Sequence, residues 1–161
     1  MSLESLFSLA SIAATAGWLI LVILPRWRYT QHICAVAIPL AIAVLYLGLT
    51  LKYFGRGPGG FGSLAEVSLL FSQNGPLLAG WVHYLAFDLF IGSWEVRDSQ
   101  KHGVHQLLVI PCLVMTFMLG PIGLLAYFIV RTIKSRSFFS VYGVRHPSNN
   151  CVPWISRQRD S

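Results

Sequence analysis

Charged residues are scarce in this sequence. Only 11% of its 161 residues are Asp, Glu, Lys or Arg, whereas 55% are hydrophobic. A soluble domain carries about 25% charged residues, because its surface faces water. Three stretches, 5–25, 33–51 and 106–130, contain no charged residue at all. This pattern excludes an ordinary water-soluble fold.

Cysteine is also rare, and its three positions share no metal-binding or redox spacing: Cys34, Cys112 and Cys151. An odd number of cysteines provides no disulfide framework. The first two lie inside apolar stretches, where Cys behaves as a small hydrophobic residue.

The net charge of +6 comes from basic residues in short clusters that flank the apolar stretches: Arg26 and Arg28, Lys52 and Arg56, Arg97 and Lys101, and Arg131, Lys134 and Arg136. Such clusters anchor helix ends among lipid headgroups. No basic groove interleaved with aromatic residues is visible, so the charge does not indicate a nucleic-acid partner.

A bilayer core about 30 Å thick requires about 20 apolar residues of helix. We therefore expect an all-α integral membrane domain over residues 1–136 and a loose tail over 137–161. Four transmembrane helices are predicted, at 6–24, 33–54, 76–95 and 105–130. Pro111 and the Gly120-Pro121 pair should kink the fourth helix, which is too short for two crossings.

A glycine-rich loop follows the second predicted helix and lacks the Gly-Lys-Ser/Thr ending of a phosphate-binding loop. Ser63 and Glu66 then form a capping-box pattern, which predicts a short helix ending near Gln73 and lying along the membrane surface. The basic flanks favour both chain ends on the cytoplasmic side. Because the N-terminus does not resemble a transit peptide, we expect a bacterial inner membrane.

Only the third predicted helix carries ionisable side chains near its middle, namely His83 and Asp88. A carboxylate at bilayer depth costs about 2.5–3.5 kcal/mol on insertion scales, so it normally faces a protein interior or a cavity. The sequence therefore favours a functional Asp88 that can donate a proton. The alternative is a hydrogen bond that only holds two helices together.

Helical geometry separates these two residues. At about 100° per residue, four side chains share one side of the helix: Trp81, Tyr84, Asp88 and Glu95. His83 lies about 140° from Asp88 by the same count. Either the two residues contact different helices, or the site extends around this helix.

Other polar residues follow near the end of the third helix. Arg97, Asp98 and Lys101 fit a solvated turn, whereas His105 precedes an apolar helix and fits a capping residue or a ligand equally well. Four histidines near the membrane could hold non-haem iron: His32, His83, His102 and His105. No Glu-x-x-His or His-x-x-x-His spacing supports such a site, and the sequence predicts no other cofactor.

Four segments resemble one membrane family. They are 80–92 (Gly-Trp-Val-His-Tyr-Leu-Ala-Phe-Asp-Leu-Phe-Ile-Gly), 94–98 (Trp-Glu-Val-Arg-Asp), 105–112 (His-Gln-Leu-Leu-Val-Ile-Pro-Cys) and 119–125 (Leu-Gly-Pro-Ile-Gly-Leu-Leu). The family is that of the abscisic-acid-deficiency-four proteins, which are required for neoxanthin formation in plant plastids, with their bacterial relatives. The resemblance covers residues 5–134 and is most specific at 80–92.

The resemblance implies a carotenoid substrate and an isomerisation that converts an epoxide-bearing end ring to an allene. This reaction needs an acid at the epoxide oxygen and a base at a carbon-bound proton. The first candidates are Asp88 and His83, and the second are Glu95 and His105. The aromatic residues that would bind the substrate are Trp81, Tyr84, Phe87 and Trp94.

A carotenoid is about as long as the hydrocarbon core is thick, so a spanning molecule keeps its end rings near the headgroups. End-ring chemistry at Asp88 therefore requires a tilted or partly withdrawn substrate. Three alternatives remain open: iron-dependent cleavage at the polyene centre, a scaffold that presents carotenoid to other enzymes of the pathway, and a small transporter.

Overall fold

The computed structural model describes residues 1–135, and this part of the chain is all-helical. Three helical segments are long and apolar enough to cross a membrane: α1 (Leu3–Ile23), the segment His32–Tyr53 and α4 (Asn74–Lys101). The structure thus confirms the helical class and the first three predicted helices, and it extends the third by six residues at its C-terminal end. The predicted tail lies outside the described residues.

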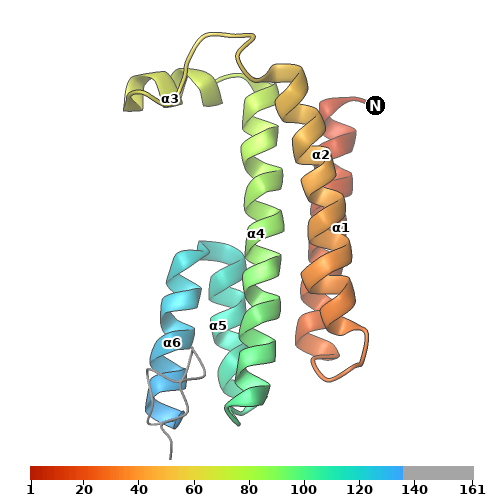
Figure 1. Cartoon of the computed structure of the whole chain (residues 1–161), viewed down its shortest axis with the longest axis vertical. Helices are drawn as coiled ribbons and strands as arrows, with labels where there is room; N and C mark the ends of the chain where they lie inside the picture. Colours follow the sequence, from red (N-terminus) through yellow and green to blue (C-terminus); the bar gives the residue numbers. More distant parts are fainter. Residues whose placement is uncertain (136–161) are drawn as a thin grey trace, which may run out of the picture.

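The long helix α4 contacts every other helix of the described chain. The segments α1 and α2 pack along one side of it, as Figure 1 shows. Glycines allow the closest approach of α1 to α4, because a Cβ atom on Gly92 would lie 2.5 Å from the ring of Trp18. The site described below is therefore built on the most enclosed helix of the molecule.

The second membrane segment begins with a π-helical turn, η1 (His32–Ala37), and continues as α2 (Ile38–Tyr53). The N–H of Ile38 donates to the carbonyl of Ile33, five residues earlier. Pro39 explains this wider turn, because proline lacks an N–H and its ring clashes with the carbonyl four residues before it.

The stretch 105–130, predicted as one kinked crossing, instead forms two antiparallel helices. They are α5 (Gln106–Leu119) and α6 (Pro121–Ser135), and the chain reverses at Gly120, which adopts φ 53° (Figure 1). This backbone conformation favours glycine, and Pro121 suits the first turn of the next helix. With 14 residues, α5 is about 21 Å long, which is too short to cross a bilayer core. The expectation of four crossings is therefore replaced by three long helices and a hairpin.

The short surface helix is present as α3 (Leu64–Phe71), which projects sideways beside the N-terminal end of α4 (Figure 1). Its N-terminus is capped as the sequence predicts, because the Ser63 hydroxyl accepts a hydrogen bond from the N–H of Glu66 at 3.2 Å. The Glu66 carboxylate in turn accepts from the N–H of Gly62 at 3.1 Å.

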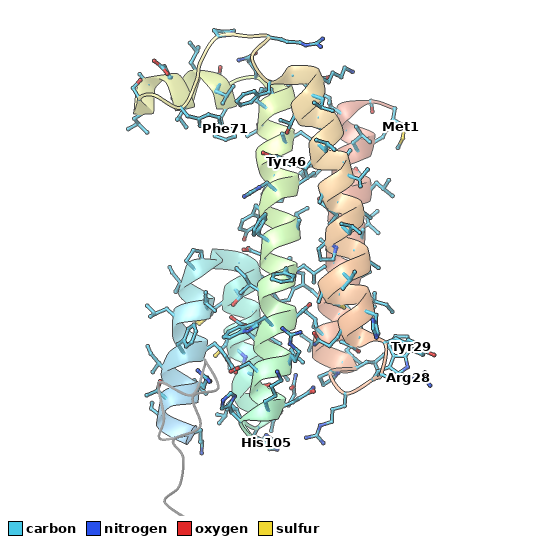
Figure 2. The ribbon with its side chains drawn as sticks, in the orientation of Figure 1. Met1, Arg28, Tyr29, Tyr46, Phe71 and His105 are labelled. Carbon is cyan, nitrogen blue, oxygen red and sulfur yellow. The ribbon has the colours of Figure 1, made fainter. Side chains whose placement is uncertain are left out.

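The hairpin places the end of α6 away from the N-terminus. Figure 2 shows Arg28 and His105 at one end of the molecule and Met1 and Phe71 at the other. Because α6 runs back toward the end of His105, it finishes opposite Met1. The C-terminal end, whose side was predicted, lies outside the described residues. Five exposed basic residues gather at the end that we call the basic end: Arg26, Arg28, Arg97, Lys101 and Lys134.

Candidate functional site

The carboxyl group of Asp88 lies at the middle of α4, beneath the turn between α5 and α6. Asp88 is only 7% exposed. A Cβ atom on Gly120 would lie 3.4 Å from its Oδ1 and 3.5 Å from its Oδ2, so the turn packs directly on the carboxylate. Oδ2 has no hydrogen-bond partner among residues 1–135. A buried carboxylate oxygen without a protein partner is costly, and such groups concentrate at functional sites.

Tyr84 connects α4 to the same turn. Its hydroxyl donates a hydrogen bond to the carbonyl of Phe117 at 2.8 Å, and it also interacts electrostatically with Asp88. Tyr84 precedes Asp88 by four residues, so the two side chains lie on the same face of α4. The hydroxyl therefore holds the end of the hairpin against the carboxyl group.

A groove along α1 and α4 is lined by Tyr84, the residue that interacts with Asp88. It consists of two cavities of about 580 and 510 Å³ that share Trp81 and Tyr84 in their walls, and we call it the α1/α4 groove. Its upper cavity reaches α3 and its lower cavity reaches the hairpin turn, with apolar side chains predominating in both. The other lining residues are Leu3, Glu4, Phe7, Phe71, Asn74, Leu77, Leu78 and Gly80 above, and Ser11, Thr15, Leu85, Phe117, Met118 and Leu119 below.

Trp81 is fixed in the wall of the groove. Its indole N–H donates to the Ser11 hydroxyl at 3.3 Å, and its ring centroid lies 5.6 Å from that of Phe7 and 5.7 Å from that of Tyr84. Aromatic rings held in this way present flat, rigid apolar faces. The predicted substrate-binding residues Trp81 and Tyr84 thus line one groove.

The carboxyl group of Glu95 lies two turns farther along α4 and is fully buried against α5. The Thr116 hydroxyl donates to its Oε1 at 2.9 Å, whereas Oε2 has no hydrogen-bond partner among the described residues. Neither Asp88 nor Glu95 is among the residues that line the groove. Asp88 interacts with the lining residue Tyr84, whereas Glu95 lies two turns farther along α4.

A second buried polar cluster joins the end of α4 to α6. Arg131 forms a salt bridge with Asp98, with 2.9 Å between Nε and Oδ2, and the Tyr127 hydroxyl donates to the same oxygen at 2.7 Å. Arg131 also donates to Nε2 of His102 at 2.9 Å, which leaves Nδ1 of His102 to donate to the Asp98 carbonyl at 2.9 Å. Asp98 is only 9% exposed, so its interpretation as part of a solvated turn is wrong. Arg97 and Lys101 are exposed, as predicted.

His83 and Phe87 lie on a different face of α4 from Asp88. The His83 ring stacks on Phe87 at 4.5 Å and lies 5.4 Å from the Tyr46 ring of α2. His83 lines a cavity of about 500 Å³ between α2, α3 and α4, and Phe87 lines an apolar cavity of about 340 Å³ beside Pro39. The structure therefore does not bring together the acid–base pair suggested for Asp88 and His83.

The remaining two candidates also lie away from the groove. His105 is an exposed capping residue at the basic end, where its Nδ1 accepts a hydrogen bond from the N–H of Leu107 at 3.3 Å. Trp94 packs against α6, with its ring 5.7 Å from Tyr127 and 5.5 Å from Phe128. Both residues stabilise the hairpin in this structure.

The four histidines considered as iron ligands are not gathered at one place. His32 begins η1, His83 faces α2, and His102 and His105 lie at the basic end. Within residues 1–135, no three His, Cys, Asp or Glu side chains are close enough to hold a metal ion together.

The chain matches the family model described as ABA DEFICIENT 4-like over residues 5–127. This protein belongs to the ABA DEFICIENT 4-like family. The matched region contains Asp88, Glu95, the hairpin turn and the α1/α4 groove except Leu3 and Glu4, and it ends before Arg131.

A curated relative is Protein ABA DEFICIENT 4, chloroplastic, from Arabidopsis thaliana. It is 22% identical over 144 residues, which cover 84% of this chain and 64% of the relative. The chain thus spans slightly less than two thirds of the length of this relative. The relative is chloroplastic by name, so it gives no support to the expectation of a bacterial inner membrane. No solved structure matches the chain.

Sequence reasoning missed the hairpin side of the candidate site. Thr116, Gly120 and Tyr127 lie in an apolar stretch and carry no charge that would mark them. The one usable signal was Gly120-Pro121, because glycine commonly ends a helix and proline commonly begins one. That pair was interpreted as a kink.

Proposed function

We propose that this protein binds a carotenoid-like polyene in the α1/α4 groove and isomerises its end ring by acid–base chemistry at Asp88. Membership of the ABA DEFICIENT 4-like family supports the substrate class. The observation that carries the proposal is the Asp88 carboxyl group, which is buried at the middle of α4 under the hairpin turn and interacts with Tyr84 in the wall of the groove. An apolar groove that ends beside a few polar groups is the usual form of a small-molecule site.

The groove favours one pose for the substrate. Its walls follow α4 from Asn74 to Leu85, which corresponds to about 17 Å of helix. A carotenoid is about 30 Å long, equal to the hydrocarbon core, so about half of it fits in the groove. With the reacting ring beside the hairpin turn, the rest of the polyene leaves sideways into the lipid beneath α3. In this pose the carotenoid does not span the bilayer, so its end ring can reach the depth of Asp88.

The chemistry requires only one carboxyl group that acts twice. Protonated Asp88 donates its proton to the epoxide oxygen, and the C–O bond next to the polyene breaks. The resulting carboxylate removes the proton from the neighbouring polyene carbon, whose C–H electron pair becomes the second double bond of the allene. One proton moves from carbon to oxygen, the acid is regenerated, and no oxidant or reductant is consumed.

The structure supports this single-carboxyl scheme over a pair with His83, because His83 lines another cavity. Oδ1 and Oδ2 of one carboxylate can serve the two proton transfers, since the epoxide oxygen and the carbon-bound proton belong to neighbouring atoms of the substrate. Tyr84 contacts both the groove and Asp88, so it positions the ring.

The proposal is tested by expressing the chain in bacterial hosts that produce epoxide-bearing carotenoids and separating their pigments by chromatography. We expect a new isomeric pigment with the wild-type chain and none with Asp88→Asn. His83→Ala is the matched control on the same helix and should retain conversion. An unchanged pigment profile with the wild-type chain would contradict the proposed isomerisation. Full conversion by Asp88→Asn would exclude Asp88 as the catalytic group.

A second pair of variants tests the place of binding. Thr15→Trp fills the lower cavity of the α1/α4 groove, whereas Ala43→Trp fills the apolar cavity between α2 and α4. We expect the first substitution to abolish conversion and the second to leave it intact. The reverse result would move the binding site to the other side of α4.

A further inference from the structure

The proposed reaction leaves several buried titratable groups unused. Glu95 is fully buried, Asp98 is 9% exposed, and Tyr127 of α6 is also fully buried. Burying such groups at membrane depth is expensive, and a packed apolar interface between α4 and the hairpin would avoid that cost. Their presence in one interface therefore requires an explanation.

These groups form a row between Asp88 and the basic end. Glu95 follows Asp88 by seven residues, or about 10 Å of helix, and Asp98 and His102 continue the row for about another 10 Å. All four side chains fall within an arc of about 80° on the face of α4 that packs on the hairpin.

Neighbouring members of the row interact with one another. The Tyr127 hydroxyl donates to Asp98 at 2.7 Å, whereas Glu95 is linked to Asp88 and to Tyr127 only by the electrostatic effect of their charges. His102 and Asp98 lie beside each other at the end of α4, where the His102 side chain is 18% exposed. The row thus begins at the proposed catalytic carboxyl group and ends where water reaches the protein.

Two carboxylate oxygens without a hydrogen-bond partner lie in the half of this row that includes Asp88 and Glu95. Oδ2 of Asp88 and Oε2 of Glu95 are both buried without a hydrogen-bond partner among the described residues. A bridging water with two to four polar neighbours is the usual partner of such atoms, and it also conducts protons. The remaining polar groups near these two oxygens are Tyr84 beside Asp88, and Thr116 and Cys112 beside Glu95.

We propose that Glu95 and Tyr127 relay protons between Asp88 and the water at His102 and Asp98. The inference rests on the proposed function for its purpose, because a catalytic acid at mid-membrane must obtain its proton before the first turnover. In each step an O–H bond breaks on one group and an O–H bond forms on the next. One proton therefore travels the row, and no other reactant is needed.

Buried polar groups that only stabilise the interface between α4 and the hairpin would have the same geometry. The test must therefore separate a role in stability from a role in proton transfer. Glu95→Gln keeps the size of the side chain and an oxygen that can accept from Thr116, but its amide cannot pass a proton in the same way. A structural role therefore predicts little change on this substitution, whereas the relay predicts a large one.

The experiment follows the proton on Asp88 directly, in protein reconstituted in lipid vesicles without any carotenoid. Infrared spectroscopy after a change from H₂O to D₂O reports exchange as a shift of the protonated carboxyl band, which Asp88→Asn identifies by removing it. We expect exchange to slow by about tenfold or more in Glu95→Gln and in Tyr127→Phe. Glu66→Gln, which alters an exposed carboxylate on α3, should exchange at the wild-type rate.

Exchange at the wild-type rate in both relay variants would overturn the proposal, as would the absence of any carboxyl band that Asp88→Asn removes. Thermal unfolding shows whether each variant is folded, and Tyr127→Phe decides the question if Glu95→Gln is not. Because no pigment is present, a failure of the relay is distinguishable from a failure of the proposed isomerisation, which the pigment profile measures separately.

Discussion

Gly120 packs directly on Asp88, so that a Cβ atom at this glycine would lie 3.4 Å from the carboxylate. Gly120 also adopts φ 53°, which residues with a side chain rarely tolerate. The turn that reverses the hairpin is therefore also the part of the protein that covers the proposed catalytic group. A change at this turn should affect stability and chemistry together.

Gly120→Ala tests this relationship against Gly103→Ala. Both glycines have positive φ, at 53° and 66°, but nothing lies within 4 Å of a Cβ on Gly103. Each substitution should cost about 1–2 kcal/mol of stability for its backbone conformation. Only Gly120→Ala should also reduce pigment conversion at a temperature where both variants are folded. Equal conversion by the two variants would show that the turn does not position Asp88.

Tyr84→Phe should loosen the turn without changing the shape of the groove. The lost hydrogen bond to the Phe117 carbonyl is worth about 1 kcal/mol, and that buried carbonyl loses its side-chain partner. We expect a small decrease in melting temperature and a larger decrease in conversion. Tyr46→Phe, beside His83 on the α2 side, is the control and should convert normally; a similar loss in both variants would contradict the assignment.

Arg131→Met should detach α6 from α4. The guanidinium group is 1% exposed and its Nε lies 2.9 Å from Asp98, and breaking a buried pair of this kind costs about 3–5 kcal/mol. Limited proteolysis and thermal unfolding in detergent should both report the loss. Lys134→Met, an exposed substitution one turn later, should change stability by less than about 0.5 kcal/mol. A stable Arg131→Met protein would show that the hairpin stays attached to α4 without the Arg131–Asp98 ion pair.

The side on which each loop lies can be measured by cysteine labelling. Five exposed basic residues lie at the basic end, and basic loops remain on the cytoplasmic side in a bacterial host. In a variant with its native cysteines replaced, Arg28→Cys and Lys101→Cys should react only with reagents that reach the cytoplasm. Arg56→Cys, in the loop before α3, should react from the opposite side. Labelling of all three positions from one side would contradict the arrangement of three long helices.

The sequence was sufficient to predict α1, α2, α3 and α4, because long uncharged runs and the Ser63–Glu66 capping box are local signals. It was not sufficient for the hairpin. A run of 25 uncharged residues has the length of one crossing, and whether Gly120-Pro121 bends or reverses it depends on packing against α4. The polar face of α4 decides the outcome, since Asp88, Glu95 and Asp98 must be covered by protein and a two-helix hairpin covers more of that face.

For the candidate site, the sequence predicted which residues share a face of α4 but not their partners on α5 and α6. Asp88, Tyr84 and Trp81 share a helix face by simple periodicity, and the structure places Trp81 and Tyr84 in one groove, where Tyr84 interacts with Asp88. The separation of His83 also follows from periodicity, at about 140° from Asp88. Partners from other helices, such as Thr116 for Glu95 and Arg131 for Asp98, depend on how α5 and α6 fold back, and no local pattern encodes them.

A groove that stops about halfway along α4 holds only one end of an elongated molecule at a time. A symmetrical molecule would have to leave, turn over and enter again before its second terminus could react. Under the proposed pose, the product altered at one terminus should accumulate first, and a doubly altered product should form only after a separate binding event.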